Sequence, residues 1–230
     1  MKYKFGKTYV IALGGSIVFP DQIDVSFIKQ FKKLVEELVG DGKRFVLVVG
    51  GGKLARMYQE AAKEISKLSD KDKDWIGIHA TRSNAQLLHA IFGDMVEPVI
   101  IDNRNRIRPL RKPVTIGSGW QPGWSTDFVT SAIAKDLGVK EFIIAGTPDH
   151  VYEKDPAKYP KARTFDELSW GIYRKLVPEK WIPGASAPVD PIAAAFSQKH
   201  GLKAIVIDGR RLSNFKRLLK GQTFVGTLIK

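Results

Sequence analysis

Apolar residues follow two alternating patterns along this chain of 230 residues. Short apolar runs predict buried strands, whereas apolar residues that recur every three or four positions predict amphipathic helices. The predicted strands are 7–13, 44–50, 98–101, 113–117, 141–146, 203–209 and 224–229. The predicted helices are 24–39, 54–65, 76–92, 125–137, 188–201 and 212–221. Residues 147–160, rich in proline, aspartate and lysine, are predicted to form a loop.

Strands that alternate with helices are typical of an α/β protein whose mainly parallel sheet is covered on both faces. The length suits one substantial core, either a single domain or two closely joined lobes. No apolar run approaches the roughly 20 residues that a membrane-spanning helix needs. Residues 1–7 do not resemble a signal peptide, so we expect a cytoplasmic protein. Cysteine is absent, which excludes disulfides, thiolate metal sites and a cysteine nucleophile.

The net charge of +13 suits nucleic acid, an acidic surface or phosphorylated small molecules equally well. The densest cationic segment is Arg104–Lys112, within "NRNRIRPLRK". Binding of RNA or another polyanion is one interpretation of this segment. A solvated edge or a subunit contact is the interpretation we favour.

Glycine-rich turns follow three of the apolar runs, at 14–16, 50–52 and 117–123. Ligands of open α/β sheets gather at the carboxyl ends of the strands, where these turns fall. Glycine lets the backbone approach a phosphate, and the helix that follows offers free N–H groups. Each turn alone is a weak signal, but the three together predict a phosphate site.

Several other kinds of site are excluded. The chain carries neither the G-x-x-x-x-G-K-[ST] phosphate loop nor a G-x-G-x-x-G turn after its first strand. It also lacks the G-x-S-x-G signature of a serine hydrolase. The four histidines, at positions 79, 89, 150 and 200, do not have metal-ligand spacing, so no protein-held metal is predicted.

Six segments resemble a known family. They are "ALGGS", "VLVVGGGKLAR", "DWIGIHATRSNAQLL", "PGWSTD", "DHVYEKDPAKYPKA" and "VDPIAAAFSQKHGLKAIVI". Their order is that of the amino acid kinase superfamily, and they look most like its archaeal-type uridylate (UMP) kinases. The resemblance covers essentially the whole chain. "GGGKLAR" followed by "DWIGIHATRSNA" is specific to that branch, whereas GGS or GGG alone is common to the superfamily.

The resemblance implies a three-layer α/β/α fold and a homohexamer that transfers the γ-phosphoryl group of Mg²⁺-ATP to UMP. It implies a single domain over 1–230, with an acceptor lobe at about 1–138 and a donor lobe at about 139–230. The cofactor expected is Mg²⁺, bound with ATP. In such a site Mg²⁺ and cations neutralise the transferred phosphoryl group, and no covalent intermediate forms.

The acceptor residues implied by the resemblance lie on three segments. They are Gly51, Gly52, Arg56, Asp74, Gly119, Ser125, Thr126 and Asp127. Arg56 would hold the α-phosphate of UMP, since a guanidinium binds phosphate bidentately. Asp74 would bond the ribose hydroxyls. Taken alone, Arg56 could be an exposed helix residue, and Asp74 could be the cap of the helix that follows it. The hydroxyls of Ser125 and Thr126 could also act as N-caps.

The implied donor residues are Gly14, Gly15, Ser16, Thr147, Tyr152 and Asp155. Asp190 falls where the superfamily has an aspartate that organises catalytic lysines, although it also suits an N-cap before Pro191. Many members have a lysine where this chain has Ala12. Lys53 is therefore the candidate cation for the transferred phosphoryl group.

The chain departs from the family pattern in three further places. The donor loop reads "TPDHVY", in which Pro148 removes a backbone donor and His150 replaces a glycine. Trp120 and Trp124 stand in the acceptor segment, where they could stack on a base or fill the site. The basic stretch Arg104–Arg111 is shortened, which affects acceptor-lid or intersubunit contacts.

Three functions remain open. The first is a UMP kinase, and the second is another small-phosphate kinase of this fold, acting on carbamate, an acylated amino acid or isopentenyl phosphate. Arg56 and Asp74 favour a nucleotide, because those other acceptors present no ribose. The third is a non-catalytic member that binds nucleotides or polyanions, which the altered donor loop, Ala12 and the charge of +13 keep open.

Overall fold

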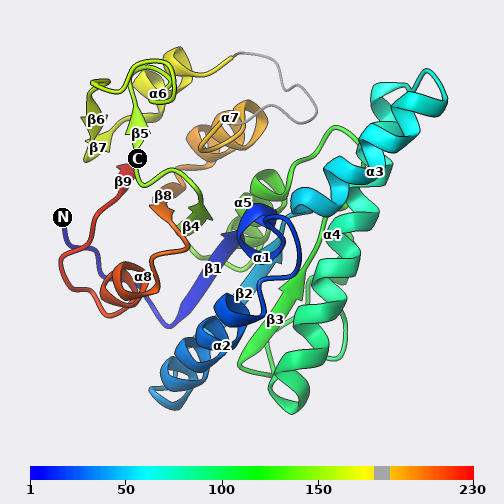
Figure 1. Cartoon of the computed structure of the whole chain (residues 1–230). Helices are drawn as coiled ribbons and strands as arrows, with labels where there is room; N and C mark the ends of the chain where they lie inside the picture. The colour runs from blue at the N-terminus through cyan, green and yellow to red at the C-terminus, as the bar shows by residue number, and fades with distance from the viewer. Residues whose placement is uncertain (179–186) are drawn as a thin grey trace.

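The computed structural model describes residues 1–178 and 187–230. A seven-stranded sheet lies at its centre, with helices on both faces (Figure 1). Its strands are β1 (Thr8–Leu13), β2 (Arg44–Val49), β3 (Val114–Gly117), β4 (Glu141–Gly146), β7 (Glu167–Leu168), β8 (Lys203–Asp208) and β9 (Thr227–Ile229). The strand order is β3-β2-β1-β4-β8-β9-β7. The first five strands of that order are parallel, and β9 is antiparallel to β8.

The helices form the two outer layers. They are α1 (Gly15–Val18), α2 (Val25–Gly40), α3 (Gly52–Ile65), α4 (Asp70–Phe92), α5 (Thr126–Asp136), α6 (Trp170–Leu176), α7 (Pro191–His200) and α8 (Leu212–Leu219). This arrangement confirms the predicted three-layer α/β/α fold with a mainly parallel sheet. No helix in the described ranges is long and apolar enough to cross a membrane.

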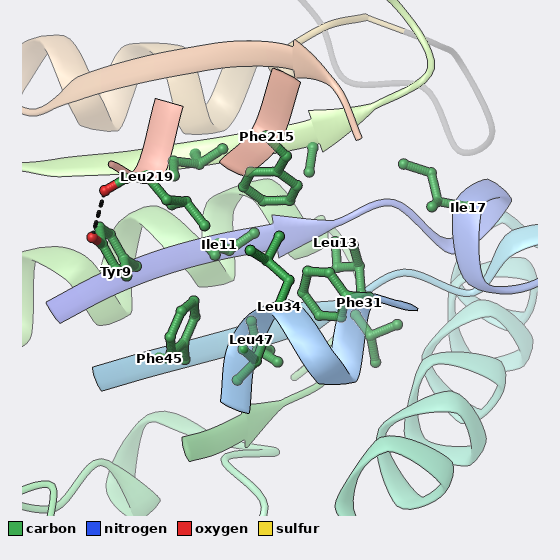
Figure 2. Packing of buried hydrophobic residues seen from close by; sticks show 14 of the residues in the cluster. Tyr9, Ile11, Leu13, Ile17, Phe31, Leu34, Phe45, Leu47, Phe215 and Leu219 are labelled. Atoms are coloured by element: carbon green, nitrogen blue, oxygen red, sulfur yellow. Dashed lines mark hydrogen bonds between the residues drawn. The ribbon is translucent and has the colours of Figure 1, made fainter. Parts of the chain in front are cut away.

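Each face of the sheet packs against its own set of helices. Successive strand residues point to opposite faces, so β1 contributes Tyr9, Ile11 and Leu13 to one core and Val10 and Ala12 to the other. The first core includes the apolar faces of α2 and α8, and the second includes those of α5 and α7. Figure 2 shows the first core, with residues of α2 and α8 packed over β1 and β2.

A buried hydrogen bond ties the first strand to the end of α8. The hydroxyl of Tyr9 donates to the carbonyl oxygen of Leu219 across 2.7 Å (Figure 2). Burial raises the pKa of Tyr9 to about 12, with the charge of Asp41 adding to the effect, so the hydroxyl keeps its proton. Because the proton is retained, this bond holds together two residues that lie 210 positions apart in the sequence.

Most predicted elements are present, and several boundaries differ. The helices predicted from 54 and 76 begin at Gly52 and Asp70. The strand predicted at 98–101 does not form, because this segment makes only an isolated bridge from Ile101 to Gly117. The predicted loop 147–160 contains β5 (Val151–Tyr152), which pairs with β6 (Thr164–Phe165).

Side-chain caps fix the starts of the helices that border the site. Ser125 accepts a hydrogen bond from Phe128 N at the start of α5. Asp190 accepts bonds from Ile192 N and Ala193 N at the start of α7. The N-cap interpretation of both residues is thus confirmed. Such caps stabilise a helix by about 1 kcal/mol and fix the direction in which the chain enters it.

Candidate active site

Two cavities adjoin at the carboxyl ends of the parallel strands. The first, here the β4 cavity, has a volume of about 640 Å³ and is lined by the ends of β1 and β4 and by β5. The second, here the glycine-turn cavity, has a volume of about 380 Å³ and is lined by the glycine turns and α4. Ser16, Thr126 and Ala187 line both. Ligands in the two cavities would therefore meet at Ser16 and Thr126.

The β4 cavity gathers most of the residues predicted for the donor. These are Gly14, Ser16, Thr147, Tyr152 and Asp155. Ala12 lines it too, at the position where many family members have lysine. Asp127, predicted for the acceptor, also faces this cavity.

The glycine-turn cavity gathers the residues predicted for the acceptor. These are Gly51, Gly52, Arg56, Asp74, Gly119, Ser125 and Thr126. Gly15, predicted for the donor, lines this cavity instead. Three segments distant in the sequence thus supply one wall each, as the resemblance implies.

The glycine turns after β1 and β2 pack backbone against backbone. A Cβ on Gly15 would lie 2.1 Å from Gly52 N, and one on Gly50 would lie 2.5 Å from Gly15 N. Gly52 also has a φ of +63°, which favours glycine. The glycines are therefore required by the contact between the two turns, in addition to any approach of a phosphate.

Asp74 anchors the loop opposite it. Gly123 N donates to Asp74 Oδ2 across 2.8 Å, which joins α4 to the segment before α5. Burial raises the pKa of Asp74. Its interpretation as a helix cap is wrong, because α4 begins earlier and its N-cap is Ser69, which accepts from Asp72 N.

Two polar residues of α4 that sequence reasoning missed hold the glycine turns in place. Asn84 Nδ2 donates to the carbonyl oxygen of Gly50 across 2.8 Å. Gly119 N donates to Thr81 Oγ1 across 2.8 Å. Both side chains are buried, and both belong to the quoted motif "ATRSNA". Their spacing of three residues, which places both on one face of the helix, was the signal that could have identified them.

Three side chains form a polar group at the starts of α5 and α7, in which Asp190 is buried and Ser125 and Asp127 are partly buried. Ser125 Oγ donates to Asp190 Oδ2, and Asp190 N lies 3.4 Å from Asp127 Oδ2. Burial raises the pKa of Asp127 to about 8, and the charge of Asp190 adds to the effect. Burial also raises the pKa of Asp190. Asp127 is therefore protonated near neutral pH and can donate to a phosphate oxygen in the β4 cavity.

The two residues predicted to be catalytic lie outside the linings of both cavities. Lys53 Nζ is 3.5 Å from Asp21 Oδ1, on an exposed part of the surface. Asp190 lies behind Ser125 and acts as the cap of α7. The exposed Arg56 is the cation of the glycine-turn cavity. In the β4 cavity the basic side chains among the described lining residues are His150 and Lys154.

The two tryptophans differ in position. Trp120 is buried, and its Nε1 donates to the carbonyl oxygen of Ile101 across 3.1 Å, so it fills the core. Trp124 lines the glycine-turn cavity and packs against Phe128, with ring centres 4.7 Å apart. Only the second can therefore contact a base.

The altered donor loop keeps an ordinary backbone. His150 has no positive φ, since none of the described non-glycine residues does. Tyr152 is fixed by its hydroxyl, which donates to Asp149 Oδ1 across 2.6 Å. Pro148, His150 and Tyr152 all line the β4 cavity, so this loop forms one of its walls.

Known proteins resemble the chain over nearly its whole length. A model of the amino acid kinase family matches residues 7–208. The uridylate kinase of Thermococcus kodakarensis is 33% identical over 225 residues, covering 96% of this chain and 98% of the relative. The uridylate kinase of Methanocorpusculum labreanum is 33% identical over 224 residues, covering 96% of this chain and 94% of the relative.

Solved structures show the same fold. The crystal structure of uridylate kinase from Archaeoglobus fulgidus matches with a TM-score of 0.81 and 29% identity, covering 98% of this chain and 100% of that one. The UMP kinase from Bacillus anthracis matches with a TM-score of 0.78 and 18% identity, covering 99% and 97%. The second likeness concerns the fold alone.

Proposed function

We propose that this chain, which belongs to the amino acid kinase family, transfers the γ-phosphoryl group of ATP to UMP. The observation that carries the proposal is the pair of cavities that meet at Ser16 and Thr126. A kinase must bring two phosphates together in line, and two cavities with a shared wall provide that arrangement. The relatives named uridylate kinase support UMP as the acceptor.

UMP occupies the glycine-turn cavity in this proposal. Arg56 holds its α-phosphate, and the amides of Gly51 and Gly52 approach the same group. Asp74 accepts hydrogen bonds from the ribose hydroxyls, while its second oxygen keeps the bond to Gly123. Trp124 lies in the lining where a pyrimidine can stack.

ATP occupies the β4 cavity. Tyr152 and Asp155 lie on the nucleoside side, and Gly14 and Ser16 face the phosphates. No group of three His, Cys, Asp or Glu side chains suited to a metal is found in the ranges described. Mg²⁺ bound through nucleotide phosphates needs only one or two protein carboxylates, so this residue set fits Mg²⁺ that enters with ATP. Its contribution when bound is to neutralise phosphate charge.

The chain's own residues align the reactants and lower the charge between them. The attacking oxygen belongs to an ionised phosphate, so no general base is needed. Asp127 donates a hydrogen bond to the transferred group, and Asp190 positions Ser125 beside it. Lys53 is the proposed additional cation, because its exposed contact with Asp21 can be replaced by a bound phosphate.

The lobes and the assembly are also part of the proposal. Residues 1–138 form the acceptor lobe and residues 139–230 the donor lobe. Met57, Tyr58 and Ile65 of α3 are exposed apolar residues, which supports burial of this helix in a homo-oligomer, a hexamer as the resemblance implies.

A non-catalytic nucleotide-binding protein is the second candidate. It is favoured by Ala12 in the lining of the β4 cavity, where a lysine would supply charge to the donor phosphates. Carboxylates of Glu153 and Asp155 also line that cavity. Such a protein would bind ATP without turnover.

The deciding experiment measures ADP release from Mg²⁺-ATP with UMP, CMP, dUMP or no acceptor. We expect UMP-dependent turnover, and a KM for UMP that rises at least about tenfold in Arg56→Ala because a charged hydrogen bond is lost. Lys63→Ala, which removes another exposed cation from α3, is the control and keeps the wild-type KM. A folded protein that binds ATP but releases no ADP with UMP, CMP or dUMP would contradict the UMP kinase proposal and favour the second candidate.

A further inference from the structure

A third cavity is lined by residues of α1, α2 and α8. Its volume is about 820 Å³, and it lies between the start of α2 and the start of α8. Three arginines line it, namely Arg210, Arg211 and Arg217. We call it the arginine cavity. It takes no part in the function proposed above, yet Ser16 lines it as well as the other two cavities.

Two of these arginines share one buried carboxylate. Arg210 binds Asp208 through Nε to Oδ1 at 2.9 Å and through NH2 to Oδ2 at 3.0 Å. Arg210 NH2 also donates to the carbonyl oxygen of Thr147 across 3.2 Å. Arg211 Nε lies 3.4 Å from the same Asp208 Oδ2. Two adjacent cations therefore face one anion, which leaves one net positive charge beside Asp208.

The rest of the lining adds little negative charge. Arg217 contacts the amide oxygen of Asn214 at 3.4 Å and forms no ion pair among the described residues. Asp24 is the one acidic residue in the described lining. Its Oδ1 accepts the hydrogen bond from Phe27 N that caps α2. Hydroxyl groups of Ser16 and Ser213 supply further donors.

We propose that the arginine cavity binds an oligophosphate, with the guanidinium groups of Arg211 and Arg217 as its main contacts. Arg211 lies beside buried Asp208, and an anion placed between Arg211 and Arg217 would accept from both guanidinium groups and relieve the repulsion between them. The ligand is either a separate oligophosphate or the phosphate tail of a nucleotide that extends past Ser16. In both cases its contact with Ser16 links it to the two other cavities.

The test is calorimetric titration of the full chain with inorganic tripolyphosphate at low ionic strength. We expect at least one binding site per chain, and a loss of affinity of about tenfold or more at one site in the double variant Arg211→Gln/Arg217→Gln. Arg210 is left in place because it pairs with buried Asp208. The matched control is Arg108→Gln/Arg111→Gln, which removes the same charge from the segment 104–112 and keeps the wild-type affinity.

Other outcomes overturn the proposal. Equal weakening in both double variants means that the anion responds only to overall charge, and weakening in the control alone assigns it to the segment 104–112. Unchanged affinity in Arg211→Gln/Arg217→Gln also overturns it. If that variant is poorly folded by circular dichroism, Arg211→Lys/Arg217→Lys replaces it, with weaker binding expected because bidentate contacts are lost.

Titration with tripolyphosphate at saturating ATP distinguishes a separate oligophosphate from the phosphate tail of a nucleotide. Unchanged binding of tripolyphosphate identifies a separate anion. Competition between ATP and tripolyphosphate that disappears in Arg211→Gln/Arg217→Gln identifies the phosphate tail of the nucleotide. The titration needs no turnover, so its result is independent of the kinase proposal.

Discussion

Gly15 and Gly52 contact each other so closely that a Cβ on Gly15 would lie 2.1 Å from the amide nitrogen of Gly52. The two glycines begin α1 and α3, in the turns that follow β1 and β2, two strands that pair in parallel with Leu13 opposite Val49. Their contact therefore fixes one turn relative to the other at the carboxyl ends of these strands. The wall shared by the β4 cavity and the glycine-turn cavity depends on this contact, since Ser16 follows Gly15 directly.

Replacement of Gly15 by alanine should consequently disturb both turns. We expect Gly15→Ala to lower the free energy of unfolding by about 3 kcal/mol, because the neighbours are backbone atoms that cannot rotate away. Turnover should fall even where the protein stays folded. The control is Gly40→Ala at the end of α2, where an added Cβ meets nothing within 4 Å. This variant should raise the free energy of unfolding by about 0.5–1 kcal/mol, because alanine loses less conformational entropy than glycine in a helix. Chemical denaturation of both variants checks this, and a wild-type stability in Gly15→Ala would contradict it.

Asp74 should matter for the acceptor and not for the donor. We expect Asp74→Asn to raise the KM for UMP about tenfold, because a charged acceptor for the ribose hydroxyls is lost, with the KM for ATP unchanged. The asparagine Oδ1 can still accept from Gly123 N, so the loop stays anchored. Steady-state kinetics with each substrate varied in turn makes the comparison. Equal increases in both KM values would assign Asp74 a purely structural role.

The sheet was predictable because its strands are buried on both faces. β1, β2, β4 and β8 are nearly continuous apolar runs, a pattern that depends only on burial. Ile101 marks the limit of this reasoning, since "PVII" is apolar but makes only one bridge at the edge of the sheet. The start of α4 was missed because its first residues are mostly charged, so no apolar residues recur there every three or four positions.

The site was predictable only where a motif carried it. Arg56 and Asp74 were identified by their motifs, and the structure brings them to one cavity. The assignments of Gly15 and Asp127 to donor or acceptor could not be made from sequence, because each lies within two residues of the shared wall. The contact between Asp127 and Asp190 joins residues 63 positions apart, and no local sequence pattern indicates such a contact.

The two tryptophans should respond differently to UMP. We expect UMP to change the fluorescence of the wild type and of Trp120→Phe but not of Trp124→Phe, because Trp124 lines the glycine-turn cavity and Trp120 does not. Trp120→Phe should instead lose about 1 kcal/mol of stability, since the carbonyl oxygen of Ile101 loses one of its two donors and keeps Ser118 N. Fluorescence titration and denaturation of both variants separate the two effects. A signal lost in Trp120→Phe alone would reverse the assignment.

Asp127 makes the stability of the protein depend on pH. Its pKa is raised to about 8 by burial and by Asp190, whereas an aspartate in an unfolded chain has a pKa of about 3.9. Between these values the folded protein holds a proton that the unfolded chain has released. Unfolding then releases a proton, so the contribution of Asp127 to the free energy of unfolding falls as the pH rises from about 4 to about 8.

Asp127→Asn should remove this dependence, because an amide has the shape of the neutral acid and cannot ionise. We expect the variant to match the wild type near pH 4.5 and to exceed its free energy of unfolding at pH 8 by at least about 1.4 kcal/mol, the equivalent of one pKa unit. Asp136→Asn is the control, because Arg104 lowers the pKa of Asp136, so this carboxyl is ionised in both the folded and the unfolded chain throughout this pH range. Its loss should therefore lower the free energy of unfolding by a similar amount at every pH. Urea denaturation of the three proteins between pH 4.5 and 8.5 compares the profiles. Parallel pH profiles of Asp127→Asn and the wild type would mean that Asp127 is ionised in the folded protein and cannot donate to a phosphate oxygen.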